Sequence, residues 1–349
     1  MVVDDILVRG PPTATAEFYR RLAGRFDMKD PTYLTHDTPI TYPGLHITLF
    51  DKAGDTYISI DQQVDLENYL ADIGITETNV VANPMSCKSE ILSNPELLLD
   101  EDAAWYRSVV GALNYYACAT RYDTAYPTSV LSQYSCRPTR GAKKALLRVL
   151  AYLACTSEFS LTGKFGGRHD DLEAYSDSDM AGNQARDTRS QTGIMLILNG
   201  APVHWRSAKQ PVTAISSACA EIYALSECVK HARLLTWRGH ELGVGLDSTL
   251  NVQVDNAQAK SFAEGTCVQS KLRGTFNVRD GWVQELRDRH HLIVSKVDTV
   301  NNCADLLTKV HKTARFKQLL SMIGSKLARR CVVERAMLSR VLLGNISAA

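Results

Sequence analysis

Four acidic residues stand at the boundaries of predicted elements in the C-terminal half of the chain. They are Asp177 in a strand, Glu221 one turn into a helix, Asp255 at the end of another strand, and Asp305 in the first turn of a final helix. Four crowded carboxylates without a counter-ion repel one another and raise one another's pKa. A pair of divalent cations removes that repulsion, and hard oxygen ligands select Mg²⁺ or Mn²⁺ over zinc. Two such ions about 4 Å apart activate a water and stabilise the leaving oxygen in phosphodiester hydrolysis.

Each acid, taken alone, has an ordinary structural explanation. Asp177 fits a solvated turn residue, and Asp255 followed by Asn256 fits a turn. Glu221 and Asp305 fit acids that favour a helix N-terminus. The occurrence of all four in one succession of elements favours a metal cluster.

The elements that would position these acids form an α/β pattern from residue 170 to 312. The predicted strands are 174–177, 193–198, 201–205, 250–254 and 292–297. The predicted helices are 216–235, 257–264, 276–288 and one that opens near Asn301. Asn199-Gly200 between two apolar runs is a strong hairpin signal, and 206–215 is expected to be a loop. The pattern predicts three antiparallel strands, a helix, a strand, helices, a strand and a helix.

The N-terminal half has a different, α+β pattern. Strands are predicted at 42–49 and 57–60, and helices at 16–26, 62–73, 105–119, 126–134 and 140–154. Residues 76–101 are polar, contain two prolines and predict a linker.

Composition restricts the class of protein. Lys and Arg number 39 against 38 Asp and Glu, so the net charge of +1 indicates no particular partner. The nine cysteines form no C-x-x-C pair and predict reduced thiols, not a disulfide framework or a zinc site. The longest apolar run is too short for a membrane span, and the first residues show no signal-peptide pattern. We therefore expect a cytoplasmic or nuclear location and no membrane partner.

Several motifs resemble the ribonuclease H domain of copia-type retrotransposon Pol polyproteins. They lie at residues 175–182, 188–193, 205–210, 216–227, 255–256 and 304–309. The resemblance implies a mixed five-stranded sheet with flanking helices, two Mg²⁺ or Mn²⁺ ions, and cleavage of the RNA strand of an RNA–DNA hybrid. It also implies that Asp177 bridges both ions, that Glu221 and Asp255 complete one site, and that Asp305 completes the other.

Five polar residues are candidates for substrate contacts. Ser216 and Ser217 begin a helix whose free N–H groups suit a phosphate, although plain N-capping explains them equally well. Lys209 and Gln210 on the preceding loop could reach the same strand, and Asn256 could bond a ribose or phosphate. Sequence-neutral contacts suffice for a hybrid, because the 2′-OH and groove shape identify it.

The resemblance extends toward the N-terminus. Residues 3–8, with Asp4 and Asp5, resemble the end of a reverse-transcriptase palm hairpin, 42–47 a primer-grip hairpin, and 106–113 with 121–123 the thumb-to-connection region. Asp4 and Asp5 would be remnant polymerase acids without the third carboxylate and the fingers region, so no polymerase activity is expected from this chain alone. Residues 273–279 depart from the family pattern.

We therefore expect four regions and one leading function. The regions are a truncated palm and thumb remnant at 1–80, a linker and helical connection at 81–165, a ribonuclease H-like domain at 170–312, and a basic helical tail at 313–349. The expected function is a retrotransposon-derived ribonuclease H, with the remainder of a Pol polyprotein as its partner. The alternative is an inactive retroelement remnant that binds nucleic acid without cleaving it. An integrase or resolvase core is a third candidate, but those enzymes have a different order of acids.

Overall fold

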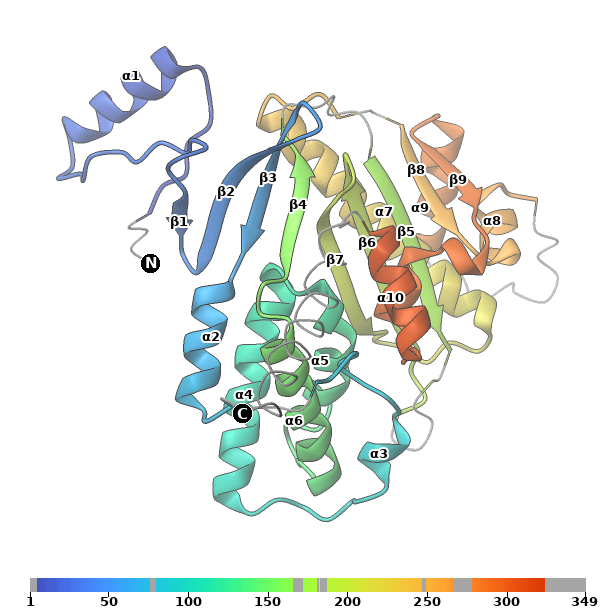
Figure 1. The fold of residues 1–349 in the computed structure, drawn as a ribbon. Helices are drawn as coiled ribbons and strands as arrows, with labels where there is room; N and C mark the ends of the chain where they lie inside the picture. The colour runs from blue at the N-terminus through green and yellow to red at the C-terminus, as the bar shows by residue number, and fades with distance from the viewer. Residues whose placement is uncertain are drawn as a thin grey trace.

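The computed structural model describes residues 5–75, 80–165, 172–180, 182, 187–246, 249–266 and 278–323. The described chain is a mixed α/β structure with two sheets, one from the N-terminal part and one from the C-terminal part (Figure 1). Asp4 and most of the 273–279 segment lie outside the described residues, and so does the predicted tail beyond residue 323. No helix in the described ranges combines the length and apolar character needed to cross a bilayer.

The C-terminal sheet has five strands in the order β7-β6-β5-β8-β9. Their bounds are β5 Leu172–Asp179, β6 Gln191–Leu198, β7 Ala201–Lys209, β8 Leu250–Val254 and β9 Leu292–Lys296. β6 runs antiparallel to β5 and β7, whereas β8 is parallel to both β5 and β9. Asn199 and Gly200 have positive φ angles of 50° and 78°, as the predicted hairpin turn requires. The mixed five-stranded sheet expected from the sequence is therefore confirmed.

Both faces of this sheet are covered, which explains why β6 is an almost continuous apolar run. On one face, Ala174 and Ile194 pack beneath α7 (Ser217–Glu241), close to α8 (Ala257–Ala263) and α9 (Val278–Asp288). On the other face, Tyr175 and Met195 pack against residues 303–323 and against aromatic residues from the N-terminal half. The strand pleat divides neighbouring residues between these two cores.

The last part of the sheet domain differs from the prediction. The predicted final helix near Asn301 is wrong, because the chain forms two 3₁₀ turns, η3 (Thr299–Asn301) and η4 (Cys303–Leu307), before α10 (Thr313–Met322). The Asn302 side chain accepts a hydrogen bond from Ala304 N and donates one to Ser176 O at 3.0 Å. This double contact fixes the turn against β5. The expected loop at 206–215 is also shorter, because β7 continues to Lys209.

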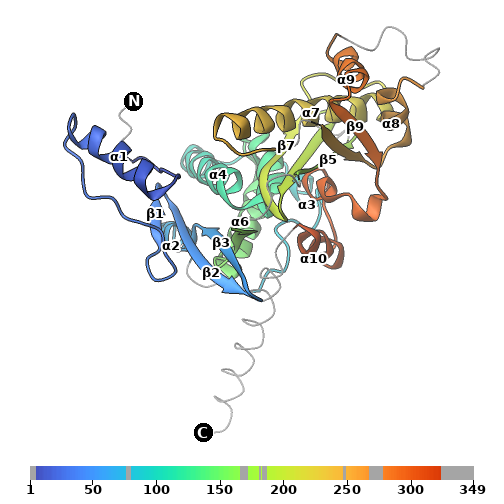
Figure 2. The same cartoon turned by 90° about the horizontal axis from the view of Figure 1, so that it is seen from above.

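The N-terminal sheet has the order β1-β2-β3-β4 and is antiparallel throughout. Its strands are β1 Ile40–Tyr42, β2 Leu45–Lys52, β3 Asp55–Asp61 and β4 Ser160–Lys164. The last of these has no counterpart among the predicted strands. α1 (Pro12–Ala23) buries none of its residues and lies apart from the rest of the molecule (Figures 1 and 2).

Helices connect the two sheets and share a core with both. They are α2 Gln63–Asp72, α3 Ser89–Leu92, α4 Asp100–Ala119, α5 Ala125–Ser132 and α6 Arg140–Cys155, with a 3₁₀ turn η1 at Tyr122–Thr124. Trp205 Nε1 in β7 donates a hydrogen bond to Ala117 O in α4 at 2.6 Å. Asn83 Nδ2 donates one to His311 O at 3.0 Å. The first bond joins the edge strand β7 to a connecting helix, and the second joins the loop after α2 to the segment between η4 and α10.

Candidate metal centre

Three of the four predicted acids meet at one edge of the five-stranded sheet. Asp177 lies near the end of β5, Asp255 directly follows β8, and Glu221 lies in the second turn of α7. Each offers a carboxylate oxygen, and these oxygens all lie within 4.8 Å of one another. The meeting follows from topology, because β5 and β8 are parallel neighbours and their C-terminal ends share an edge.

Burial makes it more costly for the three carboxylates of this cluster to be ionised together. Burial, with the charges of Asp177 and Asp255, raises the pKa of Glu221 to about 9. Burial also raises the pKa of Asp177 to about 6, although Lys309 and the Thr308 hydroxyl act in the opposite direction. Glu221 Oε2 is buried and has no hydrogen-bond partner among the described residues. An orphaned, buried carboxylate oxygen facing two other carboxylates fits a divalent cation with oxygen ligands.

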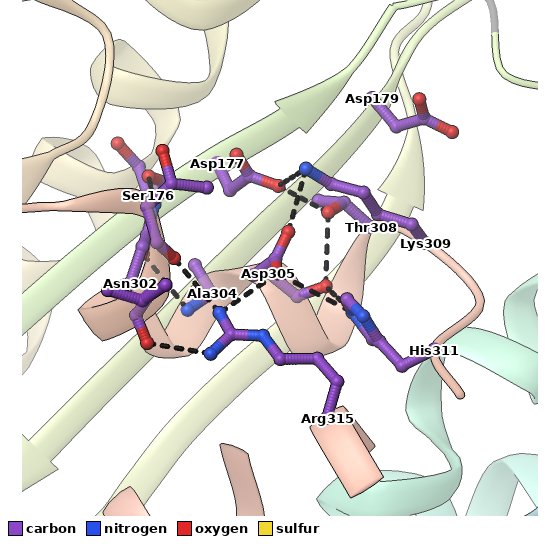
Figure 3. Close-up of polar contacts among 12 residues, drawn as sticks. Ser176, Asp177, Asp179, Asn302, Ala304, Asp305, Thr308, Lys309, His311 and Arg315 are labelled. Atoms are coloured by element: carbon purple, nitrogen blue, oxygen red, sulfur yellow. Dashed lines mark hydrogen bonds and ion pairs between the residues drawn. The ribbon is translucent and has the colours of Figure 1, made fainter. Parts of the chain in front are cut away.

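Asp305 stands beside this cluster, and its carboxylate lies close to two cations and a histidine (Figure 3). Its Oδ1 is 2.7 Å from Lys309 Nζ, and its Oδ2 is 3.2 Å from Arg315 Nη2 and 3.7 Å from His311 Nε2. Lys309 Nζ also lies 3.7 Å from Asp177 Oδ2. Lys309 therefore joins Asp305 to Asp177, and Asp305 is not among the three acids whose oxygens lie within 4.8 Å.

The predicted site residues do not include Thr308, Lys309 or Arg315. Thr308 Oγ1 donates a hydrogen bond to Asp177 Oδ2, which fixes that carboxylate from the side of η4. A signal was present in the sequence, because Lys309 follows Asp305 by four residues, a spacing at which side chains in a helical turn meet.

Gly193 allows η4 to approach Asp177. It is the β6 residue directly opposite Asp177, and a Cβ there would lie 2.7 Å from Ala304 O and 2.7 Å from Thr308 Cγ2. We expect Gly193→Ala to push η4 away and lower the free energy of unfolding by about 1–3 kcal/mol. Urea unfolding measures this. The matched control is Gly111→Ala in α4, where a Cβ meets nothing within 4 Å and should stabilise by up to about 1 kcal/mol. Equal stability of Gly193→Ala and wild type would contradict the prediction.

The pKa of Glu221 predicts how stability depends on pH without metal. The native state keeps a proton on Glu221 between its ordinary value of 4.5 and about 9, so it binds more protons than the unfolded state in that window. Stability therefore falls as pH rises through the window. In EDTA, we expect Glu221→Gln to have a higher Tm than wild type at pH 9 by about 3 °C or more, and a smaller difference at pH 5. Thermal melts measure this, with the exposed Glu241→Gln as a control that should follow wild type. A difference in Tm between Glu221→Gln and wild type that is the same at pH 5 and pH 9 would contradict the prediction.

The five predicted substrate residues have different environments. Lys209 ends β7, where Nζ donates to Arg189 O at 2.5 Å, and Ser217 is exposed in the first turn of α7. Ser216 Oγ accepts from Cys219 N at 3.2 Å and is the N-cap of α7. Asn256 Oδ1 likewise caps α8 by accepting from Gln258 N at 2.8 Å.

Gln210 is the buried member of the five. It is 1% exposed and donates to Thr192 Oγ1 at 3.1 Å and to Ala220 O at 2.9 Å. Gln210 lies in the predicted loop directly after β7, but its amide joins β6 to the first turn of α7. Because the side chain is buried, it does not reach the surface where a nucleic-acid strand would bind.

Two further acids lie outside the cluster of Asp177, Glu221 and Asp255. Asp179 points away from the Asp305 side of the site (Figure 3) and forms an ion pair with Lys88 Nζ at 3.2 Å. Lys88 also donates to Gly182 O at 3.0 Å, so it fastens the segment after α2 to the end of β5. Asp5 is exposed on the N-terminal segment.

The chain is similar to retrotransposon polyproteins over most of its length. It is 31% identical over 330 residues to the retrovirus-related Pol polyprotein from transposon TNT 1-94 of Nicotiana tabacum, covering 93% of this chain and 24% of that protein. It is 30% identical over 325 residues to the Pol polyprotein from transposon RE1 of Arabidopsis thaliana, covering 92% of this chain and 21% of that protein. The chain thus spans about a fifth to a quarter of these relatives.

A shorter relative and two solved structures are also similar. The secreted RxLR effector protein 161 of Plasmopara viticola is 42% identical over 133 residues, which cover 38% of this chain and 92% of that protein. LC11-RNase H1 in complex with RNA/DNA hybrid aligns over 40% of this chain and 94% of its own, at 18% identity and a TM-score of 0.31. The foamy viral protease-reverse transcriptase aligns over 78% of this chain and 30% of its own, at 11% identity and a TM-score of 0.43. No family model matches the chain.

Proposed function

Because the chain belongs to the retrovirus-related Pol polyproteins of copia-type transposons, we propose that it is a ribonuclease H that hydrolyses the RNA strand of RNA–DNA hybrids. The observation that carries the proposal is the meeting of Asp177, Glu221 and Asp255 within 4.8 Å at one sheet edge. The orphaned Glu221 oxygen supports a divalent cation there. The remainder of the Pol polyprotein is the proposed partner.

In this proposal the acidic residues would bind the metal ions, and other residues hold the acids in place. Asp177, Glu221 and Asp255 would hold one Mg²⁺ or Mn²⁺, and Asp177 with Asp305 would hold a second. When bound, two such ions activate a water and stabilise the leaving oxygen of a phosphodiester. Thr308 holds Asp177 in place through its hydroxyl, and Asn302 holds the η4 turn against β5.

Substrate contacts in this proposal come from the same sheet edge. β5 and β7 are both antiparallel to β6, so Lys209 at the end of β7 lies at the edge where the carboxylates meet. Its ammonium and the exposed Ser217 hydroxyl would contact phosphates without reading bases. Such contacts suit a nuclease that recognises the geometry of a hybrid and not its sequence.

A cleavage assay on the purified full chain tests the proposal. A hybrid with labelled RNA should be cut in Mg²⁺ to products with a 5′-phosphate and a 3′-OH, whereas duplex DNA and single-stranded RNA should remain intact. EDTA should stop the reaction, and Glu221→Gln should reduce it to background. If wild type and Glu221→Gln give the same background while both bind the hybrid, the chain is the inactive nucleic-acid binder instead.

A further inference from the structure

Lys309 occupies the space between the two halves of the acidic cluster. Its ammonium lies 2.7 Å from Asp305 Oδ1 and 3.7 Å from Asp177 Oδ2 (Figure 3). Under the proposed function, on which this inference rests, those two carboxylates are the ones that would share the second ion. A cation of the chain itself therefore sits where Asp177 and Asp305 face each other. Burial acts to lower the pKa of Lys309, but these carboxylates raise it above its usual value, so the ammonium stays charged.

The position of Lys309 affects how many divalent ions the charges of the site can balance. With a divalent ion bound and Glu221 therefore ionised, the four carboxylates carry four negative charges, and Lys309 and Arg315 contribute two positive ones. One divalent ion in the cluster of Asp177, Glu221 and Asp255 then brings the site to neutrality. A second divalent ion added beside Lys309 would leave two uncompensated positive charges among buried groups, which is strongly unfavourable.

If the Lys309 ammonium moves away from this position, the net charge of the site changes. With two divalent ions and Arg315 but without the Lys309 ammonium, the four carboxylates leave one excess positive charge. A single phosphodiester group carries the one negative charge that neutralises it. The Lys309 side chain is 38% exposed, so it has a path into solvent or onto a phosphate. Arg315 is 21% exposed and is further held by Val300 O at 2.7 Å, so it stays with Asp305.

We propose that Lys309 is a resident cation that restricts the substrate-free protein to one divalent ion, and that it must leave the Asp177–Asp305 pair before a second ion binds. Lys309 is then a positioning residue that couples the loading of the site to the arrival of a nucleic-acid phosphate. It sets the occupancy of the site and takes no part in the chemical step.

Manganese binding to the full chain without nucleic acid tests this inference. Free Mn²⁺ measured by electron paramagnetic resonance should report one tightly bound ion in wild type. Lys309→Met keeps the length of the side chain and removes its charge, and it should tighten a second ion by about tenfold or more, which is about 1.4 kcal/mol. Lys309→Arg keeps the charge and should behave as wild type. The matched control is Lys317→Met on α10, an exposed lysine with no ion pair in the described part of the chain.

The outcomes separate this inference from the proposed function. One tight ion in every protein, with second-ion binding unchanged by Lys309→Met, overturns the inference and leaves the nuclease proposal standing. If wild type and Lys309→Met bind no Mn²⁺, the metal-dependent nuclease itself is overturned. A second ion gained by Lys317→Met as well as by Lys309→Met would show a general effect of net charge and would also overturn the inference.

Discussion

Asp177→Asn is expected to slow RNA-strand cleavage by at least about a thousandfold, which corresponds to about 4 kcal/mol of activation free energy. Asp177 is the one acid that belongs to the 4.8 Å cluster and also lies within 3.7 Å of Lys309, which contacts Asp305. An amide at this position removes a full negative charge from both halves of the site. The initial rate of hybrid cleavage at saturating Mg²⁺ measures the effect, and circular dichroism confirms folding.

Asp179→Asn is the matched control for this substitution. It makes the same chemical change two residues along β5, where the carboxylate pairs with Lys88 at 3.2 Å. We expect its cleavage rate to stay within about threefold of wild type, because an ion pair near the surface is worth only about 1 kcal/mol or less. Wild-type cleavage by Asp177→Asn, or an equal loss in both variants, would show that the cluster does not carry the reaction.

Asp123→Ala is expected to lower the free energy of unfolding by about 3–5 kcal/mol. Asp123 and Arg121 form an ion pair at 2.8 Å in which both side chains are almost fully buried. Burial alone would lower the pKa of Arg121, but Asp123 and Tyr152 raise it above its usual value, so the guanidinium stays charged. Removal of the carboxylate strands this charge in the core, and it also removes the acceptor of the Tyr152 hydroxyl, 2.7 Å away.

Urea unfolding of purified variants measures this loss. The control is Glu96→Ala, which breaks an ion pair to Arg140 at 2.9 Å whose side chains are 60% and 57% exposed. Because solvent screens such a pair, we expect a change of less than about 1 kcal/mol. Similar losses in the two variants would contradict the assigned difference between a buried and an exposed pair.

Local patterns predicted the elements that depend on neighbours in the sequence. The β6–β7 hairpin follows from Asn199-Gly200 between apolar runs, and the helices α4, α5 and α6 follow from their periodicity. Features set by distant contacts were not predictable in this way. The η4 turn forms because Asn302 bonds to Ser176 in β5, and nothing within the 301–307 segment itself indicates that contact.

The candidate site likewise has parts that could be predicted from the sequence and parts that depend on distant contacts. The topology of β5 and β8 brings Asp177 and Asp255 to one edge, and that parallel order could be expected from the order of the elements. Among the cations around Asp305, Lys309 could be expected from its spacing of four residues. Arg315 could not, because it reaches Asp305 from a separate helix after a turn whose path depends on packing. The order of acids along a sequence therefore indicates a metal site without indicating which basic residues occupy part of it.

The pairing of β3 with β4 has a consequence for how the chain folds. Asp61 pairs with Ser160, so the fourth strand joins the N-terminal sheet only after the whole stretch from α2 to α6 has been synthesised and closed into a loop. Pairing between strands so distant in sequence forms slowly. Until β4 arrives, β3 presents an open edge, which is the kind of surface that pairs with another chain. Between the synthesis of β3 and that of β4, a newly made chain is thus exposed to aggregation through this open edge.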